Sequence, residues 1–202
     1  MRLSKTIWLA ILFPLLGTVL SCEEDSKEES DFDNWQQKNE TALEQWASNS
    51  SYRKILTFSK DVTTTSTFKN SDYIYVEVLE SSDIYDAQPL YTDTCRVAYR
   101  GHYIPTVSYP EGYVFDQTYI DEFDWKTVGT AKFLTGGVVD GFATALMNMH
   151  VGDRWRVRIP YMLGYGKSDY KASSTIPGYS NLVFEIALLD FWSPGEYRSD
   201  FK

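Results

Sequence analysis

The fold is decided by residues 138–152, which read Val-Val-Asp-Gly-Phe-Ala-Thr-Ala-Leu-Met-Asn-Met-His-Val-Gly. Apolar side chains recur there at intervals of three and four, at Val139, Phe142, Ala143, Leu146 and Met149. This spacing predicts a helix of about three turns with one buried face. Gly152 is where we expect the helix to end, because glycine is a common C-terminal stop.

The period of the sequence changes immediately after this helix. Trp155, Val157 and Ile159 alternate with three arginines, Arg154, Arg156 and Arg158. Alternation of this kind predicts a strand with one solvated face, and we expect the arginines to lie on it. A lone short helix among strand patterns favours an α+β fold in which an antiparallel sheet wraps over the helix.

The rest of the chain supplies further strand patterns and no repeat. Residues rich in β-branched and aromatic side chains predict strands at 73–79, 96–103, 114–116, 131–134 and 181–191, with Cys95 at the start of the second. Residues 49–70, rich in serine and threonine, are predicted to be a loop or an irregular edge strand. Residues 117–129 show no clear period.

The N-terminal residues have the pattern of a targeting segment. Arg2 and Lys5 precede an apolar run at 7–20, which is short for a membrane-spanning helix. The run ends in Val-Leu-Ser-Cys at 19–22, which resembles a bacterial lipoprotein cleavage box with Cys22 as the lipidated residue. An uncleaved anchor and an ordinary secretory signal are the alternatives. We expect a lipid anchor on Cys22 that holds the protein to the cell envelope, on the outer membrane, with its side undecided.

An acidic run and a helical pattern follow Cys22. Residues 22–30 are predicted to be a solvated tether, although such acidic clusters also resemble surface-export signals of some lipoproteins. Ser30 and Asp33 are spaced to cap a helix over 31–47. Trp35 and Trp46 share one face of that helix, which indicates either a homodimer surface or packing on its own domain.

Composition limits the function classes. The 202 residues, 43% of them hydrophobic, suffice for one sizeable core. The net charge of −9 argues against nucleic acid, because phosphate contacts need clustered cations. His102 and His150 have no metal-ligand spacing, so we expect no metal and no cofactor. Cys95 is expected to be an inert buried thiol without a disulfide partner.

Seven short motifs occur in an order that resembles one known family. They are Tyr-Arg-Gly at 99–101, Val-Phe-Asp at 114–116, Val-Val-Asp-Gly-Phe at 138–142, Met-His-Val-Gly-Asp at 149–153, Leu-Gly-Tyr-Gly at 163–166, Ile-Pro at 176–177 and Leu-Val-Phe-Glu-Ile at 182–186. Together they look like the signature of the FKBP-type peptidyl-prolyl isomerases. The resemblance covers about residues 73–191. It implies a twisted antiparallel sheet curled around one short helix, with an apolar pocket between them.

The resemblance also implies a set of site residues. The residues matching the family's catalytic positions are Tyr99, Phe115, Asp116, Phe142 and Tyr165. Those matching its substrate-binding positions are Val138, Val139, Ile176 and Phe184, with the Val139 backbone amide as a donor. Phe142 stands where the family usually has tryptophan, and Ala131 stands where an aromatic residue is usual.

The same residues have a purely structural interpretation. Val138, Val139, Phe142 and Phe184 would be core residues in any such fold, and Tyr99 and Tyr165 would seat their hydroxyls at a core boundary. Asp116 would cap a turn at 117–118. Spacing alone does not choose between the two interpretations.

The predicted organisation is a signal peptide (1–21), an acidic tether (22–30), a helical segment with a linker (31–70), an FKBP-like domain (71–193) and a tail (194–202). The predicted function is a peptidyl-prolyl cis-trans isomerase of the cell envelope acting on proline-containing polypeptides. The alternative is a non-catalytic, peptide-binding lipoprotein with the same fold.

Overall fold

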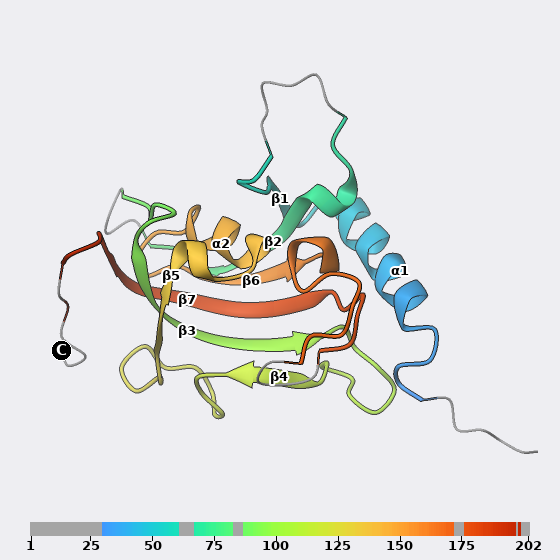
Figure 1. Cartoon of the computed structure of the whole chain (residues 1–202). Coiled ribbons are helices and arrows are strands. Elements are labelled where there is room, and N and C mark those ends of the chain that lie inside the picture. Colours follow the sequence, from blue (N-terminus) through green and yellow to red (C-terminus); the bar gives the residue numbers. More distant parts are fainter. Residues whose placement is uncertain (1–29, 61–66, 83–86, 172–175, 197, 199–202) are drawn as a thin grey trace, which may run out of the picture.

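The computed structural model describes residues 30–60, 67–82, 87–171, 176–196 and 198 (Figure 1). The predicted signal peptide, Cys22 and all of the predicted tether except Ser30 lie outside these residues. The predicted division of the chain into segments therefore stays a prediction. None of the helices in the described ranges is long and apolar enough to span a bilayer.

One antiparallel sheet forms the framework of the described chain. Its strands are β1 (Arg53–Leu56), β2 (Tyr73–Glu80), β3 (Thr94–Tyr103), β4 (Val114–Gln117), β5 (Ala131–Leu134), β6 (Arg154–Ile159) and β7 (Leu182–Trp192). The order is β1-β2-β6-β7-β3-β4, and β5 also pairs with β3. The remaining elements are α1 (Trp35–Ser48), α2 (Asp140–Leu146) and short 3₁₀ turns at 70–72, 135–137 and 161–163.

The long central pair of β3 and β7 sets the register of the sheet. Gly101 lies opposite Phe184, and Tyr99 lies opposite Ile186. Side chains alternate between the two faces of a strand, so Tyr99 and Phe184 point to one face while His102 and Val183 point to the other. We call the face towards α2 the inner face and the opposite one the outer face.

Helix α2 packs on the inner face, as the sequence predicts (Figure 1). Phe142, Ala145 and Leu146 on this helix are buried, as are Val157 and Ile159 on β6. Full burial of each large apolar side chain contributes about 1.5–3 kcal/mol. Gly141 allows the close approach, because a methyl group there would overlap the side chain of Ile159.

Helix α1 packs against the rest of the chain through a fully buried asparagine. The Asn181 backbone amide donates to Asn39 Oδ1 (2.8 Å), and Asn181 Nδ2 donates to the Asn39 carbonyl. Asn39 Nδ2 donates to the Trp35 carbonyl, and Trp35 Nε1 donates to Ser180 Oγ (2.8 Å). These bonds join the N-terminal helix to the segment that leads into β7.

The two tryptophans of α1 are buried within their own chain. Trp35 packs edge-on against Tyr103, and Trp46 packs against Tyr75. Of the two interpretations that the sequence allowed, packing on the helix's own domain is the one observed. The homodimer through this helix stays a prediction, and it would need other residues of the helix.

The ends of both helices differ from the prediction. α1 begins at Trp35, not at residue 31, and Asn34 precedes it in a left-handed conformation. Ser30 and Asp33 bond to each other in a turn before the helix instead of capping it. α2 ends at Leu146, and Gly152 (φ +94°) lies in a later turn, where its amide donates to the Leu188 carbonyl. The spacing of apolar residues predicts which face of a helix is buried, but it does not predict the residue at which the helix begins or ends.

The arginines of β6 are less solvated than predicted. Arg154 and Arg156 both donate to Glu185 on β7, and Arg156 and Arg158 both donate to Glu77 on β2. Arg158 is only 9% exposed. The prediction of a solvated face is therefore wrong for Arg158, because α1 and the residues after it cover that end of the outer face.

Replacing Asn39 with alanine tests the attachment of α1. The Asn181 amide would lose its buried acceptor, and we expect the free energy of unfolding to fall by about 2–3 kcal/mol. Urea denaturation followed by far-ultraviolet circular dichroism measures this loss. Gln36→Ala is the matched control, because Gln36 bonds only to Glu40 on the exposed side of the same helix, and its effect should stay within about 0.5 kcal/mol. Equal effects of the two substitutions would contradict the assignment.

Candidate functional site

Tyr99 lies at the centre of the inner face. Its ring contacts Phe142 from α2 and Phe184 from β7, with centroids 6.0 and 6.2 Å away. Its hydroxyl donates to Asp116 Oδ2 on β4 at 2.7 Å. Burial, and then the bond to Asp116, raise the pKa of the Tyr99 phenol above its ordinary value. Tyr99 therefore stays neutral at physiological pH and holds the exposed Asp116 carboxylate beside the aromatic rings.

Phe142, Phe184 and Phe115 continue the same cluster of rings. Phe142 is 4% exposed and meets Phe184 edge to face at 5.1 Å. Phe115, which is half-buried on β4, meets Phe184 edge to face at 5.5 Å. Perpendicular contacts of this kind are the favoured geometry for aromatic pairs. Side chains of β3, β4, α2 and β7, spread over residues 99–184, thus build one apolar surface beside the Asp116 carboxylate.

Phe133 belongs to this group of rings and was not predicted. It lies on β5, 5.7 Å from the Tyr99 ring and 6.2 Å from the Phe142 ring. Phe133 is two residues from Ala131, where the family usually has an aromatic side chain, and both residues lie on the same face of the strand. Strand alternation was the signal that could have identified it. We call Tyr99, Phe115, Phe133, Phe142 and Phe184 the aromatic cluster.

Tyr165 lies near the polar side of the cluster. Its ring stacks on Tyr170 with centroids 4.3 Å apart. Burial, and then the nearby Tyr170 and Asp116, raise the pKa of the Tyr165 phenol above its ordinary value. Tyr170 was not predicted, because it lies in a loop without periodicity. The Tyr165 hydroxyl is thus a neutral hydrogen-bond donor in the neighbourhood of Asp116.

Ile176 is buried, and its position is fixed by backbone bonds. Its amide donates to the Tyr170 carbonyl at 2.9 Å, and its carbonyl accepts from the Tyr170 amide at the same distance. Pro177 follows, and its carbonyl accepts from Ser180 Oγ, which is the hydroxyl that accepts from Trp35. The loop that carries Ile176 is therefore connected to helix α1.

Val138 and Val139 lead into α2 and are half-buried against the core. The Val139 carbonyl accepts from the amides of Phe142 and Ala143, which opens the helix. The Val139 amide makes no hydrogen bond to any other group that the structure describes. An unpaired amide at the start of a helix is a donor available to a ligand carbonyl.

Gly101 allows the rings of Phe115 and Phe184 to meet. A methyl group at this position would lie 2.8 Å from Phe115 Cζ and would overlap the Phe184 ring. Tyr103, two residues further along β3, stacks on Phe115 at 5.1 Å and touches Trp35 of α1. Tyr103 is, after Phe133 and Tyr170, a third aromatic contact of the site that the sequence did not single out.

Other reactive side chains lie apart from this site. Cys95 is buried as predicted, and burial raises the pKa of its thiol to about 11. His102 points to the outer face, where burial lowers the pKa of its imidazole. Among the residues that the structure describes, no three His, Cys, Asp or Glu side chains are grouped to hold a metal ion.

A family model described as "FKBP-type peptidyl-prolyl cis-trans isomerase" matches residues 86–189, just over half of the chain. The chain belongs to this family. The matched residues include all of the predicted site positions from Tyr99 to Phe184. The roles of these residues as a site stay a prediction, which rests on the family signature.

Two curated relatives show how much of the chain is shared. The FKBP-type 22 kDa peptidyl-prolyl cis-trans isomerase of Escherichia coli is 38% identical over 104 residues, which is 52% of this chain and 44% of that protein. The macrophage infectivity potentiator of Trypanosoma cruzi is 32% identical over 111 residues, or 55% and 50% of the two chains. This chain thus matches about half the length of these relatives or less.

Solved structures agree with the fold. A peptidyl-prolyl cis-trans isomerase of Pseudomonas syringae superposes with a TM-score of 0.56 at 21% identity, over 81% of this chain and 97% of that one. FkpA of Escherichia coli gives 0.55 at 25% identity, over 80% and 61%. The first of these similarities extends beyond residues 86–189 and supports the α+β arrangement with an N-terminal helix.

Substituting Gly101 with alanine tests the packing of the aromatic cluster. The added methyl group forces Phe115 and Phe184 apart, and overpacking of this kind costs about 1–3 kcal/mol. We expect a lower melting temperature and shifted aromatic ring signals in the proton NMR spectrum. In the control Gly137→Ala, the new methyl group meets Leu134 Cβ at an ordinary 3.5 Å. Unchanged ring signals in the Gly101 variant would show that the cluster is not packed as described.

Proposed function

We propose that this protein is a peptidyl-prolyl cis-trans isomerase that acts on proline-containing polypeptides. The observation that carries the proposal is the Tyr99–Asp116 hydrogen bond beside the aromatic cluster, in a chain of the FKBP-type family. The curated names of the relatives that match residues in this range include the same activity. The aromatic cluster is proposed to receive the proline ring.

Cis-trans isomerisation of an X–Pro bond depends more on an apolar environment around the bond than on a reactive side chain. Rotation about a peptide bond has a barrier of about 18–20 kcal/mol, because resonance gives the bond double-bond character. The two isomers of an X–Pro bond are close in energy but exchange in tens to hundreds of seconds. The twisted state has less charge separation than the planar amide. An apolar surface that removes water from the carbonyl therefore disfavours the planar state more than the twisted one.

Polar groups at the edge of the cluster would fix the substrate. The Tyr165 hydroxyl and the Val139 amide are proposed to donate to carbonyl oxygens near the proline, and Asp116 to act as an orienting acceptor. No side chain needs to transfer a proton in this scheme. The raised pKa of the Tyr165 phenol suits this role, because the group stays protonated and able to donate.

A non-catalytic peptide-binding protein is the second candidate, because Phe142 occupies the position that is usually tryptophan in the family. Phenylalanine offers a smaller apolar surface and has no indole N–H. Such a protein would bind proline peptides without accelerating their isomerisation. The two candidates differ in one measurable quantity, the rate of exchange.

Exchange spectroscopy on a proline tetrapeptide separates these functions. We expect the full protein to accelerate cis-trans exchange, and Tyr165→Phe to lower kcat/KM by about tenfold, the value of one hydrogen bond of about 1.4 kcal/mol. Asp116→Ala should also lower it. Tyr109→Phe is the control, since Tyr109 is an exposed tyrosine of the 104–112 loop. Absence of acceleration would favour the binding protein, and an unchanged rate in Tyr165→Phe would refute the polar assignments.

We also propose that the protein is anchored to the outer membrane through lipid on Cys22. The support is the sequence alone, because residue 22 lies outside the described structure. Two or three acyl chains hold a protein to a bilayer stably, whereas one does not. An isomerase held in this way would act on polypeptides at the cell envelope.

Metabolic labelling with an alkynyl fatty acid tests the anchor. In bacterial cells that express the full chain, we expect label on the wild-type protein and none on Cys22→Ser. Cys95→Ser is the matched control, because the Cys95 thiol is buried and should accept no lipid. Label that persists in Cys22→Ser would refute the anchor.

A further inference from the structure

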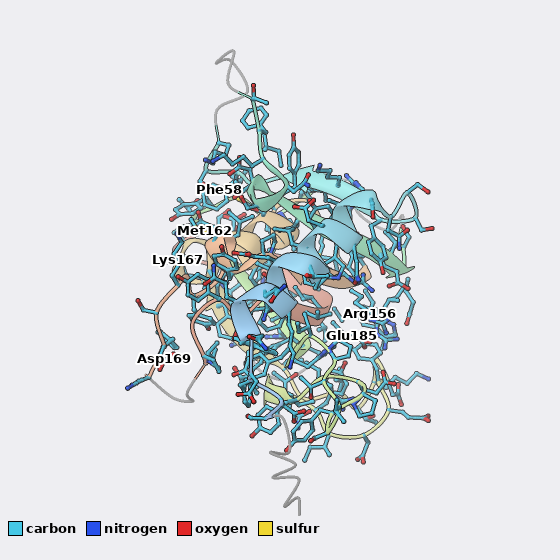
Figure 2. All side chains as sticks on the ribbon, turned by 90° about the vertical axis from the view of Figure 1, so that its right-hand side faces the viewer. Phe58, Arg156, Met162, Lys167, Asp169 and Glu185 are labelled. Carbon is cyan, nitrogen blue, oxygen red and sulfur yellow. The ribbon has the colours of Figure 1, made fainter. Side chains whose placement is uncertain are left out.

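A hollow of about 680 Å³ lies on the outer face of the sheet, away from the aromatic cluster. Helix α1 forms one wall, strands β3, β6 and β7 form the floor, and the 104–112 loop forms the other wall. Figure 2 shows two of the floor residues, Arg156 and Glu185, next to each other beside α1. The volume falls in the range of small-molecule sites, about 300–1,000 Å³.

Apolar side chains line part of this hollow. Trp46 and Ala42 come from α1, Ile104 from the loop, Val114 from β4 and Val183 from β7. Val114 and Val183 are the chain neighbours of Phe115 and Phe184, and the alternation of the strands sends them to the opposite face. The two sites therefore share strands but no side chains.

The floor of the hollow has an excess of hydrogen-bond donors. Its lining holds three arginines, Arg100 on β3 and Arg156 and Arg158 on β6, and two glutamates, Glu185 on β7 and Glu111 at the rim. Arg156 and Arg158 also pair with Glu77, just outside the lining, but a guanidinium carries more N–H donors than these carboxylates accept from. An anion entering the hollow would accept hydrogen bonds from these donors.

Arg158 is the arginine of the lining whose contacts indicate most clearly what the hollow could bind. Its Nη2 donates to Glu77 at 3.0 Å, and its guanidinium lies 4.0 Å above the Tyr52 ring. Its Nη1 is buried and has no hydrogen-bond partner within the described structure. Arg154 Nε on the same strand is a second buried donor without one. Buried donors normally have partners, so what this face lacks is an acceptor.

His102 and Gly112 shape the remaining wall. The His102 Nδ1 bonds to the Tyr103 carbonyl at 2.9 Å. Burial, and then Arg156 and Arg158 acting against Glu185, lower the pKa of the imidazole, so it is neutral at pH 7. Gly112 (φ +86°) lies so close to His102 and the Tyr103 carbonyl that no side chain fits. The loop is held close to β3 and leaves the hollow open beside it.

We propose that this hollow binds the carboxylate of an organic molecule with an apolar body. The carboxylate pairs with the guanidinium groups of Arg156 and Arg158, which match carboxylates in geometry. The apolar body packs on Trp46, Ile104 and Val183. Glu111, the remaining acid of the lining, is exposed at the rim and is free to move away.

Two sources supply this chemistry, a free organic acid and the C-terminal carboxylate of a polypeptide. The probes are 3-phenylpropionate, its uncharged amide, a proline-free peptide ending in phenylalanine with a free carboxylate, and the same peptide amidated. Isothermal titration calorimetry with the full protein measures their affinities. We expect each acid to bind at least about tenfold more tightly than its amide. Tighter binding of the peptide acid identifies a chain terminus, and tighter binding of 3-phenylpropionate identifies a free acid.

Variants locate the binding. Arg158→Met should weaken both acids by about tenfold or more, and Arg53→Met is the charge-matched control, because the exposed Arg53 on β1 lies outside the hollow. Gln45→Trp fills the hollow from α1 without removing a charge, so we expect it to abolish binding. This variant tests the proposal even if Arg158→Met fails to fold. Equal affinity of acids and amides, or full binding by Gln45→Trp, overturns the proposal.

Discussion

The structure depends on the antiparallel pairing of β3 with β7. This register places Gly101 opposite Phe184 and Tyr99 opposite Ile186, and it fixes which side chains reach each face. A slip of β7 by one residue would move Phe184 to the outer face, away from Tyr99, and send Glu185 into the core. A buried, unpaired carboxylate is costly, so Glu185 favours the observed register together with the aromatic rings.

Helix α1 extends the consequences of this pairing to both faces. On one side, the Asn39–Asn181 and Trp35–Ser180 bonds hold the segment between Ile176 and β7. On the other, the same helix helps to cover Arg158 of β6 and forms one wall of the hollow. One appended helix therefore supports the loop beside the aromatic cluster and creates a second concave surface that the sheet alone would not have.

Strand and helix periods allowed much of the fold to be predicted. The alternation of Trp155, Val157 and Ile159 with arginines, and the spacing around Phe142, identify β6 and α2 because each element buries one face. The ordered motifs placed Tyr99, Phe115, Phe142 and Phe184, which the structure brings together, while their catalytic roles stay proposals. The helix ends were mispredicted, since hydrogen bonds to distant segments decide where a backbone leaves the helix.

The sequence by itself determined the order of the elements from β2 to β7 and which face of β6 is apolar, because these follow from local spacing and residue type, and its ordered motifs resembled the family. Only the tertiary structure decided that Phe133 and Tyr103 join the aromatic contacts, that Trp35 and Trp46 are buried in their own chain, and that Arg158 is covered. Each of these depends on contacts between residues far apart in the chain. Periodicity within one element carries no information about which distant element will cover it.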